Sequence, residues 1–159
     1  MKNIFLSLFV FFVFSSIQGQ ELLPFIENFT KSNYNGDNQV WDVEQGYDNS
    51  LYFANHHYML RYNGIKWDKF TLPNKTVIRS VCAEGNRLYC GSYKEFGYWE
   101  TKEAKTVYVS LSKGKELFNG NADNEEIWKI FRYKEAIYFQ AFNILFRYKD
   151  QRIEKIAFP

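Results

Sequence analysis

Residues 51–73 read LYFANHHYMLRYNGIKWDKFTLP, and residues 137–159 read IYFQAFNILFRYKDQRIEKIAFP. The two stretches align without an insertion or deletion, since each opens on an apolar run, passes through an Arg-Tyr pair and ends on proline. A third copy begins between them at Leu88. The repeated unit is about 40 residues long, and a period of this length is typical of stacked supersecondary units.

Each unit contains four short runs of β-branched and aromatic residues separated by turn signals, without helical periodicity. Asn63-Gly64 is a hairpin signal, and Pro73 ends its unit because proline has no N–H to donate to a sheet. The sequence predicts an all-β fold, a partial β-propeller of about three four-stranded antiparallel blades. The expected strands are residues 40–43, 51–54, 58–62 and 67–72, then 78–83, 87–91, 96–100 and 106–111, then 127–131, 136–140, 143–148 and 152–158.

The three blades are expected at about residues 38–74, 75–111 and 125–159, with a polar insertion at 112–124. Insertions of this kind map to one face of a repeat array, often the binding face. Residues 20–37 are expected to form an N-terminal strand, over 24–29, and a linker with turn residues.

Three blades do not close a ring, because propellers contain about four to eight. The outer faces of the first and third blades would stay uncovered. We therefore expect an N-terminal piece of a longer protein, whose remaining blades are partners of this segment. The alternative is a homodimer, in which two such arcs pair into one ring.

The composition narrows the classes of protein. The chain is 46% hydrophobic and 20% aromatic, which excludes a disordered segment. Its formal net charge of +2, without a basic stripe, gives no reason to expect a nucleic-acid surface.

The first residues have the pattern of a secretory signal peptide. Lys2 is followed by an apolar run at residues 4–14 and a polar segment at 15–19. That run is shorter than the roughly 20 residues that a membrane span needs. We expect a signal-peptide helix over residues 1–19, cleaved after Gly19, with an uncleaved anchor as the alternative. Either predicts that the rest of the chain is exported.

Cys82 and Cys90 flank a short turn in the second unit. An exported protein could oxidise them to a disulfide, since a hairpin would place them on neighbouring strands. The alternative is two small apolar residues packed in those strands.

Two stretches of the second unit resemble a known family, NKTVIRSV at residues 74–81 and GSYKEFGYW at residues 91–99. NQVWDV at 38–43 and LRYNGIKW at 60–67 support the resemblance. The chain is similar to the two-component-regulator propeller repeats found at the N-terminus of bacterial transmembrane sensors. The resemblance extends over roughly residues 22–159.

Members of that family carry a signal peptide, a periplasmic propeller, a β-sandwich with a triple-tyrosine motif and one membrane span. They end in a histidine kinase or a LuxR-type helix-turn-helix. The resemblance implies a periplasmic, inner-membrane-anchored sensor of a small-molecule or oligosaccharide ligand. It assigns no enzyme activity to this segment, because kinase or DNA-binding domains would lie downstream of it.

No catalytic, cofactor or metal motif is present. The sequence has no Gly-rich phosphate loop, Cys-x-x-Cys, Gly-x-Ser-x-Gly or His-Glu-x-x-His. The adjacent His56 and His57 would point apart, and residues 121–126 lack the spacing of a calcium loop, which indicates a solvated loop. We therefore expect no catalytic residue, cofactor or metal.

Trp41, Arg79 and Trp128 occupy equivalent positions at the starts of the first strands. Because first strands line the channel of a propeller, these side chains could ring its mouth and bind sugar rings, acidic sugars or peptide groups. The alternative is that they are wedges packed between blades. Four further residues are expected in loops near the same rim, namely Gln39, Asn55, Tyr93 and Asn143.

These observations favour an extracytoplasmic ligand-sensing module of a signalling or transcription-regulating protein. Two other classes stay open. One is a secreted propeller enzyme acting on polysaccharide, which would need paired carboxylates on the ring face from blades beyond this segment. The other is a carbohydrate-binding module or scaffold without a signalling output.

Overall fold

The computed structural model describes residues 24–103, 105–120 and 125–157. The strands in these residues form three four-stranded antiparallel sheets packed together, which confirms the all-β prediction. Sheet 1 contains β1 (Asp42–Gln45), β2 (Leu51–Asn55), β3 (Tyr58–Tyr62) and β4 (Trp67–Phe70). Sheet 2 contains β5 (Ile78–Glu84), β6 (Arg87–Ser92), β7 (Glu95–Lys102) and β8 (Lys105–Ser110). Sheet 3 contains β9 (Lys129–Tyr133), β10 (Ala136–Gln140), β11 (Ile144–Lys149) and β12 (Arg152–Ala157).

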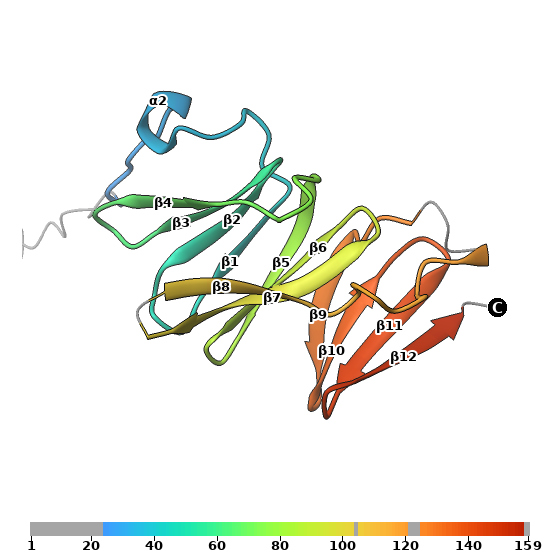
Figure 1. Cartoon of the computed structure of the whole chain (residues 1–159). Helices are drawn as coiled ribbons and strands as arrows, with labels where there is room; N and C mark the ends of the chain where they lie inside the picture. The colour runs from blue at the N-terminus through green and yellow to red at the C-terminus, as the bar shows by residue number, and fades with distance from the viewer. Residues whose placement is uncertain (1–23, 104, 121–124, 158–159) are drawn as a thin grey trace, which may run out of the picture.

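Within each sheet the spatial order of the strands follows the chain, so every sheet is a meander built from one continuous segment. The first strands lie together, because β5 contacts β1 on one side and β9 on the other. Figure 1 shows the three sheets following one another, with sheet 2 between the other two.

The first strands also point the same way. The Val81 amide donates to Asp42 (3.2 Å), and Glu44 is hydrogen-bonded to the backbone of Ala83, so β1 and β5 advance in parallel. Lys129 at the start of β9 pairs with Asp42 at 3.1 Å. Equivalent positions of the repeat therefore lie at the same end of the three sheets.

Two apolar interfaces hold the sheets together. Between sheets 1 and 2, Met59 and Leu72 pack with Val81, Cys90 and Trp99. All five are nearly inaccessible to solvent. Sheet 2 therefore buries much of one face against sheet 1.

The second interface is rich in phenylalanine. Phe96 of sheet 2 lies 4.4 Å from Phe139 and 5.1 Å from Phe146 of sheet 3, measured between ring centres. All three side chains are fully buried, and each contributes about 2–3 kcal/mol to folding. Because sheet 2 packs against a neighbouring sheet on both sides, both of its faces must carry apolar residues.

The predicted N-terminal strand over residues 24–29 does not form. Residues 24–30 have no regular structure and lead into a single helical turn, α2 (Lys31–Tyr34). The Thr30 amide donates to Asn33 Oδ1 at 2.7 Å, which starts the turn. Phe29 packs edge-on against Tyr62 and Trp67 at 4.9 and 5.3 Å, so the segment covers part of sheet 1 with side chains and forms no sheet hydrogen bonds there.

Of the two alternatives for the cysteines, the structure has the second, because both are free and buried in neighbouring strands. Cys82 lies opposite Tyr89 and Cys90 lies opposite Val81 in the pairing of β5 with β6. These register positions are adjacent, so the two thiols point to opposite faces of sheet 2. Burial raises the pKa of the Cys82 thiol to about 11, so it is protonated at neutral pH.

Two predictions concern residues that the structure does not describe. The signal peptide at residues 1–19 lies outside the described residues, as does part of the polar insertion, at 121–124. Among the described residues, no helix has the length and apolar character needed to cross a membrane.

Candidate functional site

The structure brings Trp41, Arg79 and Trp128 together, although they come from three different sheets. The guanidinium carbon of Arg79 lies 4.0 Å from the ring centre of Trp41 and 5.0 Å from that of Trp128. The two indole rings are 6.5 Å apart and inclined at 75°. Arg79 therefore makes cation–π contacts with both rings.

The strand starts explain this meeting. The Trp41 amide donates to the Ala54 carbonyl and the Trp128 amide to the Gln140 carbonyl, both at 2.8 Å, so the two tryptophans occupy the same place in their sheets. Arg79 lies in β5 at a register irregularity between Ile78 and Ser80. Irregularities of this kind re-aim a side chain.

Glu126 occupies the guanidinium fork of Arg79. Arg79 Nε donates to Glu126 Oε2 at 2.8 Å and Nη2 donates to Oε1 at 3.4 Å. The side chains are only 15% and 21% exposed. The fork is thus not open to an acidic ligand, and Glu126, expected in a solvated loop, is the residue that sequence reasoning missed. Its one signal is its place two residues before Trp128.

An aromatic surface surrounds this ion pair. Trp41 and Trp128 remain 37% and 36% exposed, and Phe142, with its ring 5.3 Å from that of Trp128, is 72% exposed. We call Trp41, Trp128 and Phe142 the aromatic patch. Each indole ring packs against Arg79 on one side and is open to solvent over about a third of its surface.

Glu125 fixes the third member of the aromatic patch. This carboxylate is 3% exposed and accepts hydrogen bonds from the amides of Phe142 (2.8 Å) and Asn143 (3.1 Å). It also accepts a bond from the Asn143 side chain at 2.8 Å. Asn143 therefore braces the turn from β10 to β11. Tyr93 forms a backbone bridge with Glu126.

Asn55 does not lie at a binding surface, contrary to expectation. It is fully buried, and its amide nitrogen donates to the carbonyls of Asp37 (2.8 Å) and Gln39 (3.2 Å). Its amide oxygen accepts from the Asp37 amide at 2.6 Å. Asn55 therefore holds the segment before β1, and Gln39 enters this arrangement through its carbonyl.

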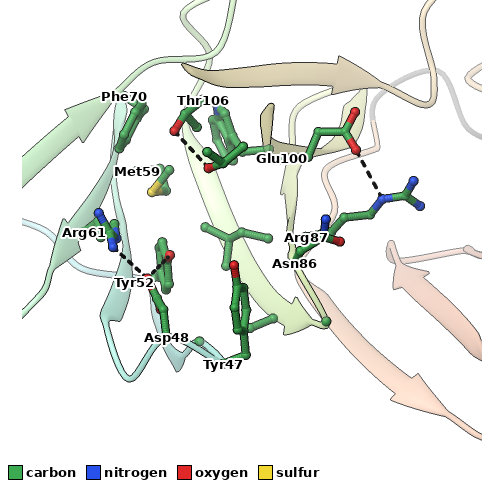
Figure 2. Close-up of a pocket in the computed structure, with 16 residues that line it drawn as sticks. Tyr47, Asp48, Tyr52, Met59, Arg61, Phe70, Asn86, Arg87, Glu100 and Thr106 are labelled. Atoms are coloured by element: carbon green, nitrogen blue, oxygen red, sulfur yellow. Dashed lines mark hydrogen bonds and ion pairs between the residues drawn. The ribbon is translucent and has the colours of Figure 1, made fainter. Parts of the chain in front are cut away.

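A pocket of about 350 Å³ lies between sheets 1 and 2 (Figure 2). None of the predicted site residues lines it. A second hollow of about 430 Å³ lies between sheets 2 and 3. Within the part of the chain that the structure describes, no group of three or more metal-ligating side chains is found.

Comparison of the chain with models of known protein families gives no match, and comparison with curated proteins gives none. The resemblance to the two-component-regulator propeller repeats stays a prediction. The candidate site therefore rests on the geometry of its own residues.

Proposed function

We propose that the chain is the extracytoplasmic ligand-binding part of a sensor, built as three blades of a β-propeller. The observation that carries the proposal is the aromatic patch, in which Trp41 and Trp128 hold Arg79 between them and still expose about a third of their surface. Exposed indoles held by a rigid scaffold are suited to binding, because a ligand need not order them.

The ligand class that fits best is a neutral oligosaccharide. Indole faces stack on the apolar C–H faces of sugar rings, and Phe142 extends the same surface. Glu126 already neutralises Arg79, so an acidic sugar would have to displace a half-buried carboxylate. A neutral sugar has no such competitor.

Signalling in this proposal depends on the coupling of ligand binding to a conformational equilibrium. A ligand that prefers one arrangement of the module and its neighbours shifts the population toward that arrangement, and in a membrane-anchored dimer the shift reaches the far side of the membrane. In this proposal the module works in the periplasm, and any kinase or helix-turn-helix output belongs to downstream domains.

The experiment is calorimetric titration of the purified full chain with neutral oligosaccharides (cello-, malto- and xylotetraose) and with an acidic tetragalacturonide. We expect saturable binding of a neutral member. Trp41→Ala and Trp128→Ala should each weaken it at least about tenfold, equivalent to about 1.4 kcal/mol. Tyr133→Ala, which removes another exposed aromatic ring on sheet 3, should leave it unchanged.

Circular dichroism would establish that the tryptophan variants fold. Absence of binding by every neutral member of the panel, or equal affinity of the folded tryptophan variants and the unaltered chain, would contradict the proposal.

A further inference from the structure

The pocket between sheets 1 and 2 lies at the opposite end of the first strands from the aromatic patch. Its lining includes the turn after β1, at residues 46–48, and the turn after β5, at Gly85 and Asn86. Trp41 and Arg79 lie instead near the starts of these strands. A molecule in the pocket would therefore contact no residue of the aromatic patch.

The deepest lining of the pocket is apolar. Met59, Leu88 and Trp99 line it and are 1%, 5% and 4% exposed. Tyr52 and Phe70, both half-buried, pack against the same apolar cluster. A thioether and aromatic side chains make favourable contacts with an aromatic ring, which indicates that the base of the pocket suits such a ring.

One side of the rim is a fixed ion pair. Arg61 Nη2 lies 2.7 Å from Asp48 Oδ2, and the same carboxylate accepts bonds from the hydroxyls of Ser50 (2.9 Å) and Tyr52 (3.2 Å). Arg61 also reaches Asp68 at 3.3 Å. Figure 2 shows Asp48, Tyr52 and Arg61 together on this side. Because these groups hold one another, the rim is preorganised.

Arg87 and Glu100 also line the pocket, but their ion pair (Nε to Oε2, 3.6 Å) lies toward sheet 3, where the Arg87 guanidinium carbon is 4.3 Å from the ring centre of Tyr98. Figure 2 shows both residues across the pocket from Arg61, with Asn86 beside Arg87. Thr101 and Thr106 add two hydroxyl groups, 3.4 Å apart. The two arginines and two carboxylates that line the pocket cancel in formal charge. The rim therefore offers neutral hydrogen-bonding groups without an unpaired charge for an ionic ligand.

We propose that this pocket binds a small neutral aromatic molecule, with its ring on Met59 and Trp99 and its polar groups at the rim. The volume of about 350 Å³ lies within the range of small-molecule sites, and an apolar base with a few fixed polar groups is their usual construction. The proposal is independent of saccharide binding at the aromatic patch. The two sites lie at opposite ends of the first strands.

The test uses the purified full chain and three matched probes, titrated by ligand-observed NMR. N-acetyl-L-tryptophanamide carries a neutral indole, N-acetyl-L-tryptophan adds one negative charge, and N-acetyl-L-leucinamide has no ring. We expect saturable binding of the first. The second should bind more weakly, because both rim arginines are already paired, and the third should bind more weakly because it lacks the ring.

Two neighbouring substitutions on β8 give the matched variants. Thr106→Trp puts an indole into the pocket and should weaken binding of N-acetyl-L-tryptophanamide at least about tenfold. Val107→Trp adds the same ring to the opposite face of the strand, where Val107 is 40% exposed, and should leave binding unchanged. Trp41→Ala should also leave it unchanged, which separates this site from the aromatic patch.

Saturable binding that Thr106→Trp weakens and Val107→Trp spares would support the proposal. Absence of saturable binding, equal affinity for the three probes, or equal loss in the two β8 variants would overturn it. Thermal unfolding of both variants shows that each is folded under the conditions of the titration.

Discussion

Asp48 shows how one carboxylate is held by its neighbours at the rim of the pocket. Burial by itself would raise the pKa of Asp48, but hydrogen bonds from Arg61 and Ser50 outweigh burial and lower the pKa below its ordinary value of 3.8. A carboxylate whose pKa is lowered by folding stabilises the folded state while it is ionised. Its contribution is fully present above 3.8 and is lost as the pH falls through the lower pKa of the folded state.

The first prediction concerns Asp48→Asn. At neutral pH this variant should have a free energy of unfolding lower by about 1 kcal/mol, because the amide cannot replace the charge beside Arg61. The difference from the unaltered chain should shrink as the pH falls below 3.8, since the unaltered carboxylate then protonates too. Urea unfolding followed between pH 7 and about pH 2 measures both effects.

Asp68→Asn is the control, because Asp68 contacts the same arginine at the longer distance of 3.3 Å. It should cost less than Asp48→Asn. A cost for Asp48→Asn that stays constant down to the lowest pH would contradict the prediction.

At the scale of single elements, the strands and their pairing within each sheet were predictable, whereas side-chain contacts between sheets were not. Hairpin signals such as Asn63-Gly64, together with the repeated apolar runs, predict the interior strands to within a residue or two. Residues 24–29 mislead because their apolar side chains suggest a strand. No neighbouring strand is available to them, and Phe25 and Ile26 stay 91% and 74% exposed.

The orientation of the cysteines and the partner of Glu126 could not be predicted from the sequence. Whether Cys82 and Cys90 share a face depends on a one-residue choice of register, which composition does not determine. The partner of Glu126 is Arg79, on another sheet. Only the packing of whole sheets creates that contact, although the equivalence of Trp41, Arg79 and Trp128 could be read from the repeat.

The second prediction concerns the close approach of β6 to the chain that enters sheet 3. A Cβ atom at Gly91 would lie 2.6 Å from Ile127 Cβ and 2.8 Å from Ser80 Oγ, closer than these atoms can pack. Gly91→Ala should lower the free energy of unfolding by about 1–3 kcal/mol through overpacking. Ile127→Ala removes Ile127 Cγ2, the atom nearest to the new Cβ, but keeps Ile127 Cβ, so the same change should cost less in that background without becoming neutral.

A double-mutant cycle with urea unfolding measures this coupling. An equal cost of Gly91→Ala in both backgrounds would show that Ile127 Cγ2 is not the atom that requires glycine at position 91.

At the scale of the whole molecule, sheet 2 is the stable centre. It packs on sheet 1 through Trp99 and Cys90 and on sheet 3 through Phe96. Sheets 1 and 3 each have one face without a neighbouring sheet in the described part of the chain, and aromatic residues such as Tyr133, 58% exposed, lie on the sheet 3 face. In arrays of this kind, stability comes from the interfaces between neighbouring units.

Local opening should therefore be rarest in sheet 2. We predict that the amides of β6 exchange with deuterium more slowly than those of β2 and β10, the equivalent strands of the other sheets. All three strands have hydrogen-bonded neighbours on both sides, so the comparison isolates the effect of face burial. Hydrogen exchange measured by NMR provides the rates, and protection of β2 or β10 equal to that of β6 would contradict the prediction.

The two free thiols make it possible to measure the opening of the interfaces between sheets by thiol labelling. Cys82 belongs to the junction of sheets 2 and 3, and Cys90 to the junction of sheets 1 and 2. A thiol reagent reaches either sulfur only after its own junction has parted, since Cys82 is 8% exposed and Cys90 is fully buried. Each interface between sheets thus contains one buried thiol. The separate labelling rates of Cys82 and Cys90 would show which interface opens first.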